Sequence, residues 1–144
     1  MLRIYQAGPL FSHAEQDFHR TMKKALQQYG HEVIWPFELF CPDEVAEWGE
    51  TAPRRIMLED SQAILSCDVV VALLDGPQVD DGTAWEIGFA YAKGIPVIGI
   101  RTDFRNCGDN AHSRVNSMIE GSCVIVSTFA GICEQLAKIE RCRR

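Results

Sequence analysis

The sequence predicts a single doubly wound α/β domain that spans residues 1–144. Short apolar runs rich in β-branched residues alternate five times with segments of helical periodicity. One run, DVVVALLD (68–75), is almost wholly apolar, as expected for a central parallel strand that is covered on both faces. The chain is also long enough for one sizeable core, with 47% hydrophobic and 24% charged residues. These observations indicate parallel strands joined by right-handed helical crossovers.

The amino-terminal part begins with a β-rich run that ends at a turn signal, Gly8-Pro9. A helical pattern with Gly30 as its stop and a second β-rich run follow. The next segment has two prolines and many acids, and long loops of this kind inside a compact domain usually carry function. The expected elements are a strand over 2–7, a helix over 12–29, a strand over 31–35 and a loop with one short helix over 36–52.

The rest of the chain continues the alternation. Its expected elements are a helix over 53–66, a strand over 68–75, a helix over 83–93, a strand over 95–100, a short helix near 113–119, a strand over 123–127 and a helix over 129–140. The simplest arrangement of five such strands is the flavodoxin-like order 2-1-3-4-5 with helices on both faces. In that order, ligands bind where the loops after the first and third strands meet. Residues 5–11 and 75–86 lie at that point.

Charge and hydropathy exclude several kinds of partner. The net charge of −6 and the pI of about 5.1 argue against a nucleic-acid polymer or an anionic membrane, and favour a small ligand. No apolar run approaches the ~18 residues that a membrane span needs, and the amino terminus lacks a signal-peptide cleavage pattern. We therefore expect a cytoplasmic protein that contacts no membrane.

Motifs for metals and cofactors are absent from the sequence. The six cysteines form no C-x-x-C pair and the four histidines lack metal spacing, so we expect reduced thiols and no metal. Neither G-x-G-x-x-G nor G-x-x-x-x-G-K-[ST] occurs, and no G-x-S-x-G indicates a serine nucleophile. We expect chemistry without a cofactor.

In the segment DGPQVDDGTAWEIGFAYAKG (75–94), three acids lie within seven positions: Asp80, Asp81 and Glu86. Thr83 and Glu86 have the spacing of a capping box, and on local sequence alone this structural interpretation is the simpler one. Alternatively, Asp80 and Glu86 both face the ligand crevice. An anionic carboxylate at a helix start, with a second acid nearby, suits glycosyl transfer, whose transition state resembles an oxocarbenium ion.

Other candidates also have ordinary structural interpretations. Asp60 in RRIMLEDSQAIL fits an exposed helix charge, and Tyr5 fits a half-buried strand aromatic. Asn116 fits a helix end and Met118 fits core filler. Gly8 fits a turn. None of these residues indicates a function by itself.

Taken in order, however, these features resemble the nucleoside 2-deoxyribosyltransferase family. The most specific match is D-x-G-T-x-x-E-x-G-x-A, from Asp80 to Ala90, whereas the early A-G-P-x-F is shared more widely. The resemblance extends from residue 4 to about 122 through the segments IYQAGPLFS, Asp60, DVVVALLDG, DDGTAWEIGFAYAKGIPVIGIRTDFR and NSM.

The resemblance implies a role in nucleotide salvage and a catalytic set. Glu86 would attack the anomeric carbon of a 2′-deoxynucleoside, and an incoming base would later accept the sugar from the covalent intermediate. Asp60 would protonate the leaving base or orient the sugar, and Asp80 would contact the base. Tyr5 would hold the carboxylate of Glu86.

It also implies a substrate-binding set and a homo-oligomer. Asn116 of a neighbouring subunit would bind the 5′-hydroxyl of the sugar, with Met118 beside it. Asp81 takes the base-binding role if the loop is shifted by one residue. The substrate-binding residues that match the family are Gly8, Phe11, Asp81, Gly82, Asn116 and Met118. Residues of the 36–52 loop, such as Trp48 or Glu47, are expected to set the base preference.

Two alternatives remain open. An N-glycosidase acting on (deoxy)nucleoside 5′-monophosphates would need a phosphate cradle, and Pro9 removes a donor from the first loop. Arg101, Arg105 and Arg114 keep this alternative open because any of them could reach the 5′ end. A non-catalytic nucleoside or nucleotide sensor would keep the crevice without needing the three acids together.

Overall fold

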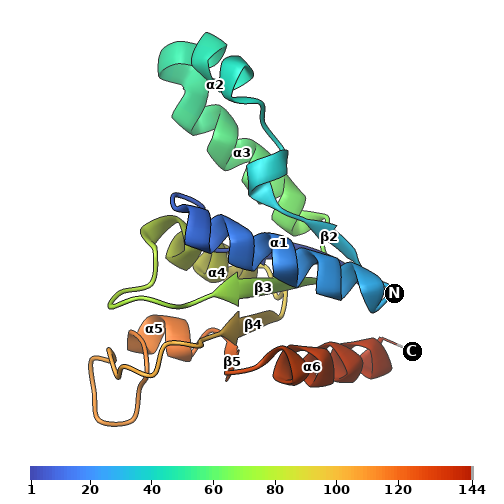
Figure 1. The fold of residues 1–144 in the computed structure, drawn as a ribbon, viewed down its shortest axis with the longest axis vertical. Helices are drawn as coiled ribbons and strands as arrows, with labels where there is room; N and C mark the ends of the chain where they lie inside the picture. Colours follow the sequence, from blue (N-terminus) through green and yellow to red (C-terminus); the bar gives the residue numbers. More distant parts are fainter. Residues whose placement is uncertain (144) are drawn as a thin grey trace.

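The computed structural model describes residues 1–143 and contains a five-stranded sheet in which every strand pairing is parallel (Figure 1). Its strands are β1 (Arg3–Ala7), β2 (Glu32–Ile34), β3 (Val69–Leu73), β4 (Val97–Ile100) and β5 (Val124–Val126). The order across the sheet is β2-β1-β3-β4-β5. The structure thus confirms the predicted flavodoxin-like fold class and strand order.

Helices cover both faces of this sheet. They are α1 (His13–Gln28), α2 (Pro42–Trp48), α3 (Ala52–Leu65), α4 (Asp81–Ala92), α5 (Ser117–Glu120) and α6 (Phe129–Cys142). Leu26 of α1 and Leu136 of α6 are buried in the core on one face, and Ile64 of α3 and Ile87 of α4 are buried in the core on the other. No helix of the described chain is both long and apolar enough to cross a bilayer.

The central position of β3 explains its apolar sequence. All five residues of the strand are buried. Val69, Val71 and Leu73 belong to the core under α1 and α6, whereas Val70 and Ala72 belong to the core under α3 and α4. Because successive side chains of a strand point to opposite faces, a strand covered on both sides needs apolar residues at every position.

The start of α4 differs from the capping-box interpretation. The helix begins at Asp81, and Asp80 is its N-cap. Oδ2 of Asp80 accepts hydrogen bonds from the backbone N–H and the hydroxyl of Thr83, each at 2.9 Å. Thr83 is therefore inside the helix, and the predicted box between Thr83 and Glu86 is wrong. An aspartate is a favourable N-cap, so the helix starts earlier and Glu86 has no capping role.

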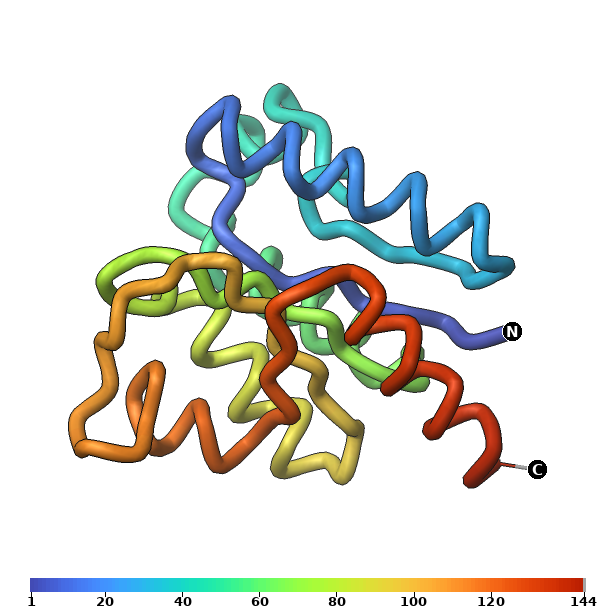
Figure 2. Tube along the Cα trace, turned by 60° about the horizontal axis from the view of Figure 1, so that its bottom comes forward, coloured from blue at the N-terminus to red at the C-terminus, as the bar shows by residue number. Residues whose placement is uncertain are grey.

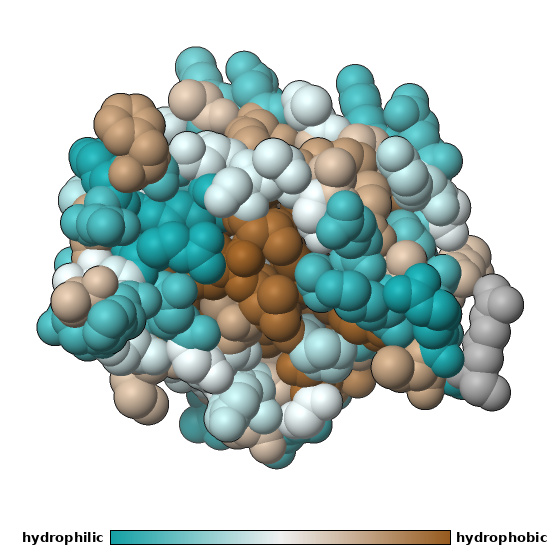
Figure 3. All heavy atoms as spheres, turned by 90° about the horizontal axis from the view of Figure 1, so that it is seen from below, coloured by the Kyte–Doolittle hydropathy of each residue, from teal (hydrophilic) through white to brown (hydrophobic). Residues whose placement is uncertain are grey.

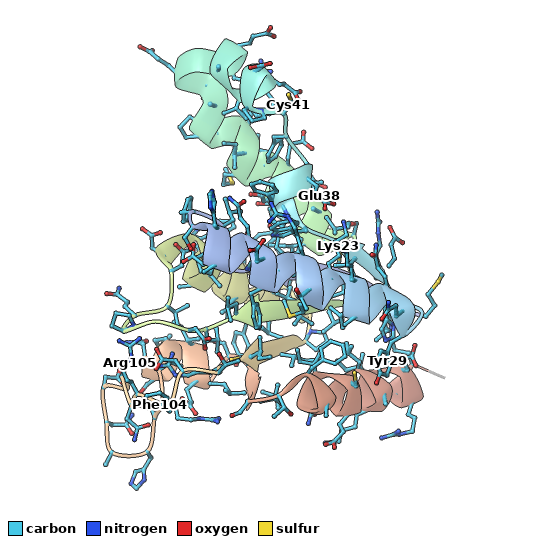
Figure 4. All side chains as sticks on the ribbon, in the orientation of Figure 1. Lys23, Tyr29, Glu38, Cys41, Phe104 and Arg105 are labelled. Carbon is cyan, nitrogen blue, oxygen red and sulfur yellow. The ribbon has the colours of Figure 1, made fainter. Side chains whose placement is uncertain are left out.

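The segment between β2 and α3 contains more structure than the expected loop with one helix. Two 3₁₀ turns, η1 (Pro36–Glu38) and η2 (Gly49–Thr51), flank α2. We call residues 39–56 the arm, because α2 and the start of α3 extend away from the sheet (Figure 1). In α2, no residue is buried. Figure 4 shows Cys41 on the arm, whereas Glu38 lies beside Lys23 of α1, with which it forms an ion pair.

The loops that follow β1, β3 and β4 lie at one end of the molecule, and the two termini lie at the other (Figure 2). This arrangement follows from the parallel sheet, since the carboxyl ends of all the strands are at the same edge. Glycine is required in the first of these loops. Gly8 has a φ of +153°, and a Cβ there would lie 2.5 Å from the ring of His19.

The β5 edge of the sheet is only partly covered. Figure 3 shows apolar atoms at the centre of the face seen from below, between α5 and α6, where β5 lies. Val124 is 52% exposed, and Ile125 and Val126 are half-buried. None of these three residues lines the cavity described next.

Candidate active site

A short hydrogen bond joins β1 to α4 at the carboxyl edge of the sheet. The hydroxyl of Tyr5, a fully buried residue, donates to Oε1 of Glu86 at 2.5 Å. The sheet fixes Tyr5 because β1 lies between β2 and β3. The contact therefore holds the carboxylate of Glu86 toward the sheet, as a hydrogen bond to a charged acceptor does when the donor is rigid.

Glu86 lines a cavity of about 630 Å³ together with two further acids, Asp60 of α3 and the N-cap Asp80. The rest of the wall comes from the loop after β1, from η1 and from the arm. Its volume lies in the range typical of small-molecule sites. The structure thus brings Tyr5, Asp60, Asp80 and Glu86 into one site, although they come from separate elements.

Two half-buried acids of the cavity, Asp60 and Glu86, have raised pKa values. Burial raises the pKa of Glu86 to about 7, the Tyr5 hydrogen bond opposes this rise, and the charges of Asp60 and Asp80 add to it. Burial, followed by the charge of Glu59, raises the pKa of Asp60 to about 6. Near neutral pH these acids can therefore exchange a proton with a ligand, one as an anion and the other as an acid.

Asp60 has an unused acceptor inside the cavity. Its Oδ1 atom is buried and has no hydrogen-bond partner among the described residues. Such an atom is costly unless a ligand or water satisfies it. Tyr5, in contrast, keeps its proton. Burial and the negative charges of Glu86 and Asp60 raise its pKa, so its hydroxyl remains a hydrogen-bond donor.

The loop after β1 is held by a buried network that the sequence analysis missed. The side-chain amide of Gln6 contacts Nδ1 of His19 at 2.9 Å and donates to the backbone carbonyl of His19 at 3.0 Å. The His19 ring stacks on Trp35, which in turn stacks on Phe37 in the cavity wall. Burial lowers the pKa of His19 to about 4, so the ring is neutral near pH 7. No local motif marks these residues, because their contacts join distant segments.

The substrate-binding candidates fall into two groups. Gly8, Phe11 and Gly82 line the Glu86 cavity. Asp81, Asn116 and Met118 instead line a separate hollow of about 670 Å³ between α4 and α5.

Asn116 and Met118 lie in the turn that starts α5. Oδ1 of Asn116 accepts from the backbone N–H of Met118 at 3.0 Å, and the Met118 side chain is 79% exposed. Asp81 accepts from the N–H of Gly82 at 2.8 Å and faces solvent. A single chain therefore does not bring these three side chains to Glu86.

The arm supplies cavity residues, but they differ from the expected ones. Trp48 packs against Phe40 with ring centroids 5.4 Å apart, and the guanidinium of Arg55 lies 5.5 Å from its ring centroid. Neither Trp48 nor Glu47 lines the cavity, whereas Phe40 and Val45 do. The cavity wall therefore does not support the expectation that Trp48 or Glu47 sets the base preference, because α2 contributes Val45 to that wall instead.

The fold and the site define an α/β protein with a cavity of small-molecule size that is lined by half-buried carboxylates. The sequence profile described as nucleoside 2-deoxyribosyltransferase matches residues 4–118, and the chain belongs to that family. Among curated proteins, no sequence matches the chain.

Solved structures agree with this assignment. A conserved protein from Enterococcus faecalis V583 is 31% identical, with a TM-score of 0.79 over 96% of this chain and 98% of that chain. A 2-deoxyribosyltransferase from Bacillus psychrosaccharolyticus is 25% identical, with a TM-score of 0.74 over 90% and 89%. A CMP N-glycosidase from Clostridium botulinum is 20% identical, with a TM-score of 0.59 over 94% and 98%, and it shows the fold alone.

Proposed function

We propose that this protein transfers 2-deoxyribose between the bases of 2′-deoxynucleosides by double displacement through a covalent 2-deoxyribosyl-Glu86 ester. The observation that carries the proposal is the placement of Glu86. It is held by Tyr5 at 2.5 Å and shares its cavity with Asp60 and Asp80. A carboxylate nucleophile that is held in place beside a second acid suits a reaction whose transition state resembles an oxocarbenium ion.

In the first half-reaction, an oxygen of Glu86 bonds to C1′ of the sugar and the glycosidic C–N bond breaks. The electron pair of that bond stays on the base, which takes a proton at a ring nitrogen from Asp60. The raised pKa of Asp60, about 6, supports this role because a protonated fraction persists near neutral pH. Tyr5 stabilises the anion of Glu86 before the attack.

In the second half-reaction, a ring nitrogen of the incoming base attacks C1′. Its N–H proton passes to the Asp60 carboxylate, and the ester bond breaks with its electron pair returning to Glu86. The acid therefore becomes the base on the return step, as microscopic reversibility requires. Asp80, with one oxygen committed to the α4 cap, contacts the base through the other.

We propose further that a neighbouring subunit completes the site. Met118 lies on α5 and Asn116 is the N-cap of that helix, and both line a hollow that is separate from the Glu86 cavity. Met118 is an apolar side chain with 79% exposure, as expected of a residue that another chain covers. In a homo-oligomer, Asn116 would bind the 5′-hydroxyl in the partner's cavity, while Phe11, Gly8 and Gly82 contact the base and sugar within the same chain.

Hydrolysis of a 5′-monophosphate is the second candidate, motivated by the fold shared with the CMP N-glycosidase. The arginines that could bind a phosphate are engaged elsewhere. Arg101 is buried and donates to the carbonyls of Leu74, Gly76 and Arg105. Arg114 pairs with Glu120. These contacts favour the nucleoside over its monophosphate.

Arg105 likewise forms an ion pair with Asp103 in the loop after β4. Figure 4 shows Arg105 and Phe104 on this loop, on the opposite side of the sheet edge from the arm. The guanidinium of Arg105 also donates through Nε to both carboxylate oxygens of Asp103. A phosphate would have to replace these bonds.

A base-exchange assay tests the two candidates. Purified protein receives 2′-deoxyinosine as the donor and adenine as the acceptor, and the products are separated by chromatography. We expect deoxyadenosine to form with the native protein and with Glu134→Gln, an exposed glutamate on α6, and not with Glu86→Gln. Release of free base from a 5′-monophosphate without any exchange would contradict the transferase and support the hydrolase.

A further inference from the structure

The Glu86 cavity is polar at its inner end and apolar at its outer end. Three residues of α3 that are spaced four apart show this change from polar to apolar along the cavity. Ile64 is buried under the sheet, Asp60 lies one turn further out, and Ile56 lies one turn beyond Asp60. Because residues four apart lie on the same face of a helix and about 6 Å apart along its axis, Asp60 and Ile56 both face the cavity at successive depths.

The arm forms the outer wall with apolar side chains. Phe40, Pro42, Val45 and Ile56 line it, and Phe37 of η1 faces the same space with 40% of its surface exposed. These side chains are not needed for the core, since α2 has no buried residue and packs only on α3 and η2 among the larger element contacts. Within one chain this apolar wall has no protein partner, and such a wall is typical of a surface that binds an apolar ligand group.

A plain nucleoside leaves this wall uncovered. Its C1′ must lie against Glu86, and its base must lie within reach of Asp60. The outer wall begins a full helical turn beyond Asp60, where the described lining residues carry no hydrogen-bonding side chain. A group there can be recognised only by its apolar surface.

The charge of the arm also limits which chemical groups can bind at the outer wall. Four exposed acids, Asp43, Glu44, Glu47 and Glu50, and two exposed arginines, Arg54 and Arg55, leave the arm with a net negative charge. This charge disfavours an anionic substituent, whereas a neutral alkyl or aryl group can contact Phe40 and Val45.

We infer, resting on the proposed transferase function, that the arm is a subsite for an apolar substituent on the base, at the edge remote from the glycosidic nitrogen. On a purine that edge carries the exocyclic 6-amino group. The predicted substrates are therefore purines whose 6-amino group bears an alkyl or benzyl group. Phe40, Val45 and Ile56 determine this specificity without touching the reacting atoms.

The test compares adenine with N6-benzyladenine as the acceptor in base exchange, in native protein and in two matched variants. Val45→Arg places a charge in the wall, and Ala46→Arg places the same charge on the next, exposed residue of α2. We expect kcat/KM for N6-benzyladenine to equal or exceed that for adenine. Val45→Arg should lower it about tenfold or more while changing adenine less than about twofold, since a buried phenyl group contributes substantially. Ala46→Arg should change neither.

The subsite is contradicted if adenine is exchanged and N6-benzyladenine is exchanged at least about tenfold more slowly by the native protein. It is also contradicted if Val45→Arg and Ala46→Arg act alike. Absence of exchange with any acceptor would reject the proposed function instead. In that case calorimetric binding of the two bases still decides: tighter binding of N6-benzyladenine that Val45→Arg abolishes supports the subsite, and equal or weaker binding overturns it. Circular dichroism confirms that each variant is folded.

Discussion

At the scale of single residues, the contact between Tyr5 and Glu86 is central to the account. A buried tyrosine that donates to a half-buried glutamate at 2.5 Å stabilises the anion that a nucleophile must be. Burial and the neighbouring acids act in the opposite direction and raise the pKa of Glu86 to about 7. The residue is thus an anion in only part of the free protein near neutral pH.

The pH dependence of kcat/KM should reflect this balance. The productive form needs Glu86 as the anion and Asp60 protonated, and their pKa values are about 7 and about 6. We expect a bell-shaped profile with limbs near these values, belonging to the pair as a whole, for a donor that does not titrate in this range. Tyr5→Phe removes the bond that lowers the pKa of Glu86, so the falling limb should move to higher pH and the maximum should decrease. An unchanged profile would argue against the role of Tyr5.

Asp60→Asn should reduce kcat by about 10²–10⁴, the usual contribution of a general acid. The loss should be smaller for a donor whose base is a better leaving group, because such a base needs less protonation. Glu59→Gln, at the exposed neighbouring position, should retain most of the activity. Steady-state kinetics with two donors measures the difference, and an equal loss with both donors would mean that Asp60 positions the sugar.

Folding stability should also depend on Glu86. Its pKa in the folded protein is raised from 4.5 to about 7, so its stabilising contribution is complete below pH 4.5 and is lost as the pH rises through 7. Glu86→Gln keeps an acceptor for Tyr5 and removes the charge. The variant should gain up to about 3 kcal/mol relative to native protein at pH 8, with little gain at pH 4. Thermal unfolding at both pH values tests this, and an equal Tm difference at both would contradict it.

At the scale of elements, the start of α4 decides what Glu86 does. Asp80 caps the helix, so Asp80→Ala should cost about 1 kcal/mol of stability, whereas Asp80→Asn should retain most of the cap. Both variants should lose base contacts. Chemical denaturation separates the two effects, and equal stability of the two variants would show that the cap contributes little.

The starts of α1 and α4 show where a capping-box spacing corresponds to a real cap and where it does not. Ser12 and Glu15 do form a reciprocal capping box at the start of α1, with Glu15 accepting from the N–H of Ser12 at 2.8 Å. Thr83 and Glu86 have the same spacing but form none. The difference arises because Asp80 offers an earlier cap and because β1 brings Tyr5 to Glu86. That contact joins positions 81 residues apart, and local spacing cannot show it.

Periodicity predicted the strands and the main helices well, because hydrophobic alternation follows directly from burial. Periodicity did not predict which residues of the arm line the cavity. Phe40 and Val45 have no distinctive spacing, and their direction depends on how α2 packs on α3. The network of Gln6, His19 and Trp35 was missed for a similar reason, since its contacts bring β1, α1 and β2 together.

At the scale of the whole molecule, the proposed site requires a second subunit. Glu86 and Asn116 lie in different cavities of the same chain. Glu86→Gln and Asn116→Ala should each abolish or strongly reduce exchange, yet a mixture dissociated and reassembled together should regain activity, because some mixed oligomers contain one intact site. Activity that remains at the level of the separate variants would contradict a shared site.

The proposal that Glu86 carries the sugar during turnover can be tested directly by mass spectrometry of protein quenched after mixing with 2′-deoxyinosine in the absence of an acceptor base. We expect a 2-deoxyribosyl adduct on the peptide that contains Glu86. The adduct should disappear on addition of adenine and should be absent from Glu86→Gln. Turnover of the donor with no adduct, or an adduct on another residue, would contradict the proposal.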